Sequence, residues 1–344
     1  MRNNQKTIDE KRGLSFAGKI ILIILPIVAA FAALSAGRMY ISFLDVIKSC
    51  ANLFGSGFDV NIQVQTVVQT IRLPRIILAV LVGGGLAVSG TTYQSLFANP
   101  LATPDTLGVA SGASFGAALG IICGFNLIGI QLFALLFGLG AVALTALSAN
   151  GREKNVGTTV LAGIMVGSLF SGLVSLLKFI ADTDTQLPAI TFWLMGSLSG
   201  AGYKSLLIGT PLIICGTIVI FLIRWRLNIL PLSEEEAYTS GVNIHLLRTI
   251  TVVCATVITA SCVSMCGQVG WIGLLVPHIC RMKFGSNHME LVPASISIGA
   301  VFMLAVDTAA RCISPSEIPV SVLTAIIGAP FFIFLLSRGK GWQL

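Results

Sequence analysis

The sequence has very few charged residues for its length. Only 10% of its 344 residues are Asp, Glu, Lys or Arg, whereas 55% are hydrophobic, and the mean hydropathy is +0.92. A soluble globular domain carries about 25% charged residues, so this chain lacks the polar residues needed to cover a water-facing surface. The composition predicts an all-α polytopic membrane protein, with residues 1–344 forming a single transmembrane domain.

Motifs typical of enzymes and of cofactor sites are also missing. No glycine-rich loop ends in Lys-Ser or Lys-Thr, so we expect no nucleotide site in this chain. The eight cysteines form no CxxC pair, and mostly lie in apolar runs where free thiols act as small hydrophobes. Cys262 and Cys266 share a helix face, which leaves a weak metal or redox role open. We predict no catalytic residue, no metal site and no cofactor, and structural packing for His278.

The positive charges lie at the ends of apolar segments. The net charge of +7 is therefore typical of a membrane protein and does not indicate a nucleic-acid partner. If the N-terminus is cytoplasmic, two-thirds of the 21 lysines and arginines fall on the cytoplasmic side. This positive-inside bias predicts that both termini face the cytoplasm in a multi-pass protein of the cell membrane.

Ten apolar segments can be assigned as membrane spans, since a crossing helix needs about 20 apolar residues. The eighth span is short, and a polar connection is expected between the first two, over residues 40–73. The predicted spans cover approximately residues 19–39, 74–97, 106–123, 128–147, 158–180, 203–223, 249–266, 271–280, 291–306 and 320–336.

The stretch from Arg72 to Ala113 contains an uncharged span that breaks at a polar Asn-Pro pair. Pro100 disfavours helical geometry at Asn99, so the second span should end there. Broken backbone at membrane depth is tolerated only where protein buries it or where it lines a cavity. The glycines of the span permit close helix packing, and the sequence leaves open whether they line a pathway instead.

Six motifs occur in a recognisable order along the chain. They are RLPR at 72–75, NPLATPDTLG at 99–108, SEEEAYTSGVN at 233–243, GWIGLLVPHICR at 270–281, the Asp307 to Arg311 pair, and EIPVSVLTAIIGAPFF at 317–332. Together they resemble the iron-siderophore and cobalamin permease family, the FecCD-type membrane subunits of type II ABC importers. The resemblance covers the chain from about residue 70 to its end, and the first span is less similar.

The resemblance implies a ten-helix permease subunit surrounded by protein and lipid partners. These are a second permease copy or close homologue, two cytoplasmic ATPase subunits, an extracytoplasmic substrate-binding protein and membrane lipid. The ATPases would bind ATP and Mg²⁺, and this chain would supply a pathway that works by alternating access. The implied substrate is an iron-siderophore, or a related chelate such as haem or cobalamin.

The resemblance also implies roles for individual residues. Arg72 and Arg311 correspond to arginines that receive acidic residues of the binding protein, and Asp307 lies one helical turn before Arg311, where the two can pair. The inner gate corresponds to Asn99, Pro100 and Leu101. The coupling loop to the ATPase, at about 227–243, includes Ser233, Glu234, Glu235, Glu236 and Gly241, with Ser233 and Glu236 spaced as in a capping box.

Each role has a simpler structural alternative. The arginines could be helix-end residues that extend to the membrane interface, Asn99 could cap the break, and the acidic triplet could be a solvated charge run. The alternative function from another class is an ion-coupled secondary transporter. That function would require charged residues within the spans, and these are almost absent away from the span ends.

Overall fold

The computed structural model describes residues 15–149, 156–232, 234–314 and 316–337, and every element within these ranges is a helix. Seven of the described helical segments are long and apolar enough to cross a membrane. These are α1 (Phe16–Ser35), the continuous segment Ile62–Leu96, α6 (Leu127–Ser148), α7 (Val156–Ile180), α9 (Tyr203–Ile223), α11 (Ile244–Cys266) and α13 (His288–Ile313). The shorter α5 (Val109–Ile122), α12 (Ile272–Phe284) and α14 (Val320–Ser337) complete the ten predicted spans.

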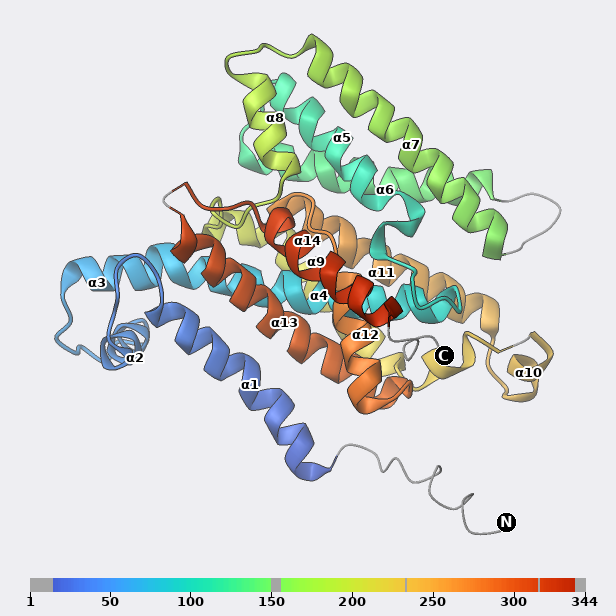
Figure 1. The fold of residues 1–344 in the computed structure, drawn as a ribbon, viewed down its shortest axis with the longest axis horizontal. Coiled ribbons are helices and arrows are strands. Elements are labelled where there is room, and N and C mark those ends of the chain that lie inside the picture. The colour runs from blue at the N-terminus through green and yellow to red at the C-terminus, as the bar shows by residue number, and fades with distance from the viewer. Residues whose placement is uncertain (1–14, 150–155, 233, 315, 338–344) are drawn as a thin grey trace.

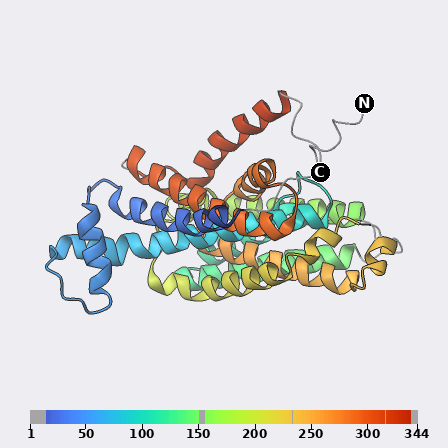
Figure 2. The ribbon, with the colours of Figure 1, turned by 90° about the horizontal axis from the view of Figure 1, so that it is seen from below.

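The predicted polar connection between the first two spans, over residues 40–73, is helical for most of its length, and the second candidate span begins at Ile62 instead of Pro74. The connection contains α2 (Phe43–Asn52), α3 (Ile62–Thr66) and a π-helix (Val67–Arg72) that continues into α4 (Leu73–Leu96). Ser42 caps α2 by accepting from the backbone of Asp45, 3.2 Å away. Pro74 has no N–H and crowds the preceding turn, so the wider π-helical turn before it is expected. In Figure 2, α2 and α3 project at one end of the bundle.

Helix α4 runs through the middle of the protein and packs against α13, α11, α12 and α9 (Figure 1). Its glycines face different neighbours. A Cβ on Gly83 would overlap the backbone of Gly299 in α13, and a Cβ on Gly85 would press on Cys262 of α11. Almost every residue of α4 is buried within the subunit. The glycine faces of this helix therefore serve close packing and do not line a pathway.

The closest approach of α4 to a neighbour lies at Gly90. Pro277 has no N–H, so it leaves the carbonyl of Gly273, four residues earlier in α12, without its helical donor. That carbonyl points at Gly90, where any Cβ would overlap it. The contact brings a Cα–H of glycine against a carbonyl oxygen, a weak hydrogen bond that recurs between closely packed helices.

In helix α1, a carbonyl freed by a proline is covered by a side chain of a neighbouring helix. Pro26 frees the carbonyl of Leu22, and the hydroxyl of Ser297 in α13 donates to that oxygen. A membrane helix tolerates an internal proline where a neighbouring helix satisfies the freed carbonyl in this way.

The remaining spans form a second group beside the α4 core. Helices α5, α6 and α7 pack on one another, α8 (Gln186–Leu194) contacts α5, and α11 connects the group to α4 (Figure 1). Close backbone contacts hold this group too, since a Cβ on Gly112 or Gly116 would overlap the carbonyl of Phe137 or Phe133 in α6. At the other edge of the bundle, α14 leans away from the other helices (Figure 2).

Substitution of Gly90 by alanine should destabilise the protein by about 1–3 kcal/mol, because the added methyl group forces α4 and α12 apart. Thermal unfolding in detergent measures this as a lowered Tm. Gly140→Ala is the matched control, since Gly140 also lies within a helix but has open space beside it. The control should be neutral or stabilising by up to about 1 kcal/mol. Equal Tm values for the two variants would contradict the packing role of Gly90.

Candidate functional site

The predicted functional residues divide between the two ends of the bundle. At one end of the bundle, α1 and α13 finish and α4 begins. A hydrogen bond connects the two finishing helices there, because Arg38, after α1, donates to the carbonyl of Ser314, after α13. At the other end, the start of α1, the end of α9 and the start of α13 line one groove that includes Lys19, Arg224 and Glu290. Helix α4 connects the two ends, with the predicted docking residue Arg72 directly before it and the predicted gate residues shortly after it.

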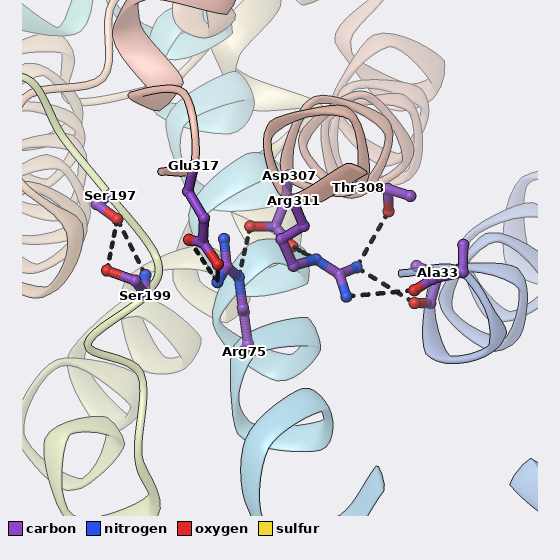
Figure 3. A network of polar contacts seen from close by, with 9 residues as sticks. Ala33, Arg75, Ser197, Ser199, Asp307, Thr308, Arg311 and Glu317 are labelled. Atoms are coloured by element: carbon purple, nitrogen blue, oxygen red, sulfur yellow. Dashed lines mark hydrogen bonds and ion pairs between the residues drawn. The ribbon is translucent and has the colours of Figure 1, made fainter. Parts of the chain in front are cut away.

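Four charged side chains, three of them buried, form a network at the end of the bundle where α4 begins (Figure 3). Arg75, in the first turn of α4, donates from Nε to Asp307 of α13 at 2.8 Å and from Nη1 to Glu317 at 3.0 Å. The second carboxylate oxygen of Asp307 lies 3.0 Å from Nε of Arg311. The predicted Asp307–Arg311 pair is therefore confirmed, and the single carboxylate of Asp307, only 1% exposed, lies between two guanidinium groups.

Glu317 supports this network from a strained position. Its φ of 50° is in the left-handed region, which costs a residue with a side chain about 1–3 kcal/mol. The ion pair with Arg75 and a backbone hydrogen bond to the carbonyl of Ser314, at 3.2 Å, hold it there. Glu317 thus ties the start of α4 to the loop that leads into α14.

Arg72 and Arg311 are buried, at 5% and 8% exposure, and both point toward the end of α1. They donate to carbonyl oxygens at or after that end, those of Leu34, Ser35 and Met39 for Arg72 and those of Ala33 and Ala36 for Arg311. The last carbonyls of a helix lack helical donors and favour positive charge, so both arginines stabilise this end of α1. The described chain already provides both guanidinium groups with partners, and docking to a binding protein stays a prediction.

The predicted gate residues form a tight turn directly after α4. Ala98 has a positive φ of 46°, and the side-chain oxygen of Asn99 accepts from the backbone N–H of Leu101 at 2.9 Å. The predicted break at the Asn-Pro pair is confirmed, and Asn99 makes the local capping contact considered from sequence. Leu101 is 44% exposed, so the turn presents an apolar side chain beyond the end of the helix.

The predicted coupling segment contains a short helix, α10 (Glu234–Thr239), which lies at the far end of the bundle from α2 and α3 (Figure 1). Gly241 has a φ of 69°, a left-handed conformation that suits the turn after this helix. The carbonyl of Glu236 accepts from the hydroxyls of Thr239 and Ser240. Ser233 and the side chains of Glu234 and Glu235 lie outside the described residues, so the capping box is untested.

A buried hydrogen bond connects the gate end of α4 to the segment before α10. The hydroxyl of Ser95, in the last turn of α4, donates to the carbonyl of Leu227 at 2.7 Å. Leu227 lies in the short helix Arg226–Ile229, which packs on α4. Ser95 is 3% exposed and Leu227 is fully buried. This bond ties the segment before α10 to the last turn of α4, shortly before the turn at Asn99.

Sequence reasoning missed the central role of Arg75 and gave no role to Ser95. The predicted topology already placed Arg75 and Asp307 at the same membrane face, so charge complementarity between span ends could have indicated that pair. No local pattern marks Ser95, because its partner is a backbone carbonyl 132 residues away.

Replacement of Asp307 by asparagine should cost about 3–5 kcal/mol of stability, because it leaves two buried guanidinium groups without their shared carboxylate. The measurement is unfolding of the purified protein in detergent. Glu317→Gln is the control, because Glu317 is 31% exposed at its side chain and, among the described residues, forms an ion pair with Arg75 alone. Its cost should be about 1 kcal/mol or less. Equal losses in the two variants would show that Asp307 does not organise the network.

Comparison with known proteins identifies the family of this chain. The family model described as the FecCD transport family matches residues 23–338. The molybdate import system permease protein MolB of Haemophilus influenzae is 40% identical over 323 residues, covering 92% of this chain and 95% of the relative. The hemin transport system permease protein HmuU of Yersinia pestis is 35% identical, covering 93% and 95%.

A solved structure shares the fold over nearly the whole chain. It is a metal-chelate type ABC transporter in an inward-facing conformation, with a TM-score of 0.84 and 38% sequence identity, covering 93% of this chain and 98% of that chain. The family match, the long alignments and the shared fold all extend from the first span to the last. The chain therefore belongs to the FecCD transport family and is an ABC transporter permease of the metal-chelate type, a transport protein and not an enzyme.

Proposed function

We propose that this permease is the membrane-spanning subunit of an importer that moves an iron-siderophore complex into the cytoplasm by alternating access. Separate ATPase subunits bind ATP and Mg²⁺ and supply the energy. Relatives of similar identity support the substrate class, because a Helicobacter pylori protein described as a probable iron chelatin transport system permease is 40% identical over 277 residues. Other relatives are described as molybdate and hemin permeases, so these ligands are the competing substrates.

The observation that carries the mechanism is the buried Ser95–Leu227 hydrogen bond. We place α10 in contact with a cytoplasmic ATPase, where its acidic first turn would meet a basic partner surface. A shift of α10 on ATP binding would move Leu227, and the bond to Ser95 would transmit that shift to the end of α4. The turn at Asn99 to Leu101 would then open or close the inner end of the pathway.

This mechanism requires the end of the bundle that carries α10 to face the cytoplasm, in agreement with the positive-inside bias of the sequence. The network of Arg75, Asp307, Arg311 and Glu317 then lies at the outer face. There it holds the ends of α1, α4 and α13 together while an extracytoplasmic binding protein docks beside Arg72 and Arg311.

A second permease copy completes the pathway. Helix α14 leans away from its own subunit and leaves Ile326, Ile333 and Phe334 exposed, which suits contact with another copy. Helix α7 exposes the hydroxyl-bearing residues Ser168 and Ser175, which donate within their own helix. An uncharged wall of this kind would let a large ligand pass without binding it tightly.

We predict that Ser95→Ala weakens coupling between ATP hydrolysis and transport. Loss of one relay contact is worth about 0.5–2 kcal/mol, so ATP-driven uptake in proteoliposomes should fall by about twofold to thirtyfold. The control is Thr92→Val, since Thr92 is equally buried in α4 but donates only to Val88 in the same helix. Both variants should still assemble with the ATPase. Equal uptake by the two variants would exclude the relay.

Uptake with the cognate ATPase and binding protein tests the substrate. Proteoliposomes receive radiolabelled ferric siderophores, haem, cobalamin and molybdate in parallel, with and without ATP. We expect ATP-dependent accumulation of a ferric siderophore above all other ligands. Preferred uptake of molybdate, haem or cobalamin would show that the substrate assignment is wrong, but the proposal of an ATP-driven importer would stand. Uptake driven by an ion gradient without ATP would overturn the importer itself.

A further inference from the structure

A groove of about 600 Å³ lies between α1, α9 and α13, at the end of the bundle that carries α10. Its volume is within the range of small-molecule binding sites. The walls are apolar along most of the groove, with Leu22, Ile23 and Pro26 from α1 and Pro293, Ile296 and Ala300 from α13. The lining belongs to membrane-spanning helices, so the groove lies at the level of lipid acyl chains.

The groove stays open because α1 touches its neighbours along one narrow line. Ser297 donates to the carbonyl of Leu22 at the base of the groove, and this bond holds α1 beside α13. Only 17% of the α1 span is buried within the subunit, and Ile23 is 66% exposed. The open side of the groove therefore faces the hydrocarbon region, where the acyl chain of a lipid would cover it.

Charged groups gather at one end of the groove, on the side of α10. Lys19 of α1, Arg224 at the end of α9 and Glu290 in the first turn of α13 all line it. The guanidinium of Arg224 donates to the carbonyl of Phe221 and lies 4.0 Å from the centre of the Phe221 ring. These contacts hold Arg224 at the rim, while its Nε is buried and has no hydrogen-bond partner within the described residues.

We propose that this groove binds a phospholipid with a primary ammonium headgroup. One acyl chain lies along the apolar walls, the phosphate lies against Lys19 and Arg224, and the ammonium group pairs with Glu290. Basic pockets between helices near the membrane surface bind lipid phosphates, because the charges remain close to water while the stems lie in the apolar region. The carboxylate of Glu290 on the same rim favours an ammonium headgroup over a purely anionic one.

Native mass spectrometry of the full-length protein in detergent tests the site, with phosphatidylethanolamine and phosphatidylglycerol as probes. We expect tighter retention of phosphatidylethanolamine. Lys19→Gln with Arg224→Gln should weaken that binding by about tenfold, which corresponds to about 1.4 kcal/mol. Glu290→Gln should remove the preference between the two lipids. The assay needs neither ATP nor substrate, so its outcome is independent of the transport proposal.

Two matched controls separate the groove from general lipid adhesion. Arg226→Gln removes a charge two residues from Arg224, but Arg226 lies outside the groove, and its variant should bind lipid normally. Ile23→Trp should block the apolar wall and displace the lipid, whereas Ile21→Trp on the same helix should not. Equal binding of the two lipids by the unmodified protein, or equal effects of Arg226→Gln and Arg224→Gln, would overturn the proposal.

Discussion

The burial of α4 on every side is the constraint on which the rest of the structure depends. A helix surrounded by four others can fit only if its side chains are small where backbones meet, and Gly83, Gly85 and Gly90 meet α13, α11 and α12 in turn. Without a hydrophobic driving force between helices in lipid, such close contact supplies much of the association energy. Because α4 packs tightly at these three glycines, it can move only together with its neighbours. A displacement at one end of α4 is therefore expected to be transmitted to the other end.

Carbonyl groups without helical donors determine which helices become neighbours. Pro26 and Pro277 each leave a carbonyl free, and the two are covered in different ways, one by the hydroxyl of Ser297 and the other by the Cα of Gly90. The end of α1 presents further free carbonyls, which receive the guanidinium groups of Arg72 and Arg311. In hydrocarbon each backbone group without a hydrogen bond costs several kcal/mol. These contacts therefore determine which helix packs beside each free carbonyl, and they also stabilise the packed pair.

Local patterns in the sequence predicted the features that depend on nearby residues. The ten spans, the break at Asn99 and Pro100, and the pair of Asp307 with Arg311 all follow from hydropathy, proline geometry or helical spacing. The helices within residues 40–73 were missed because their polar residues resemble a loop. Arg75 with Asp307, and Ser95 with Leu227, join positions far apart in the chain, so only the packing of helices reveals them. The roles in docking, gating and coupling stay predictions.

The π-helix at Val67–Arg72 has a consequence for how this region tolerates insertion and deletion. A π-helical turn holds one more residue than an α-helical turn of the same height. Removal of a single residue there would leave a regular α-helix of normal hydrogen bonding, with no break in the backbone. Everything before the deletion, including α3 and the α2 segment, would keep its orientation relative to α4, whereas the same deletion in a regular α-helical turn would rotate it by about 100°. The π-helix is thus a position at which one residue can be removed without turning α2 and α3 relative to the membrane span that follows.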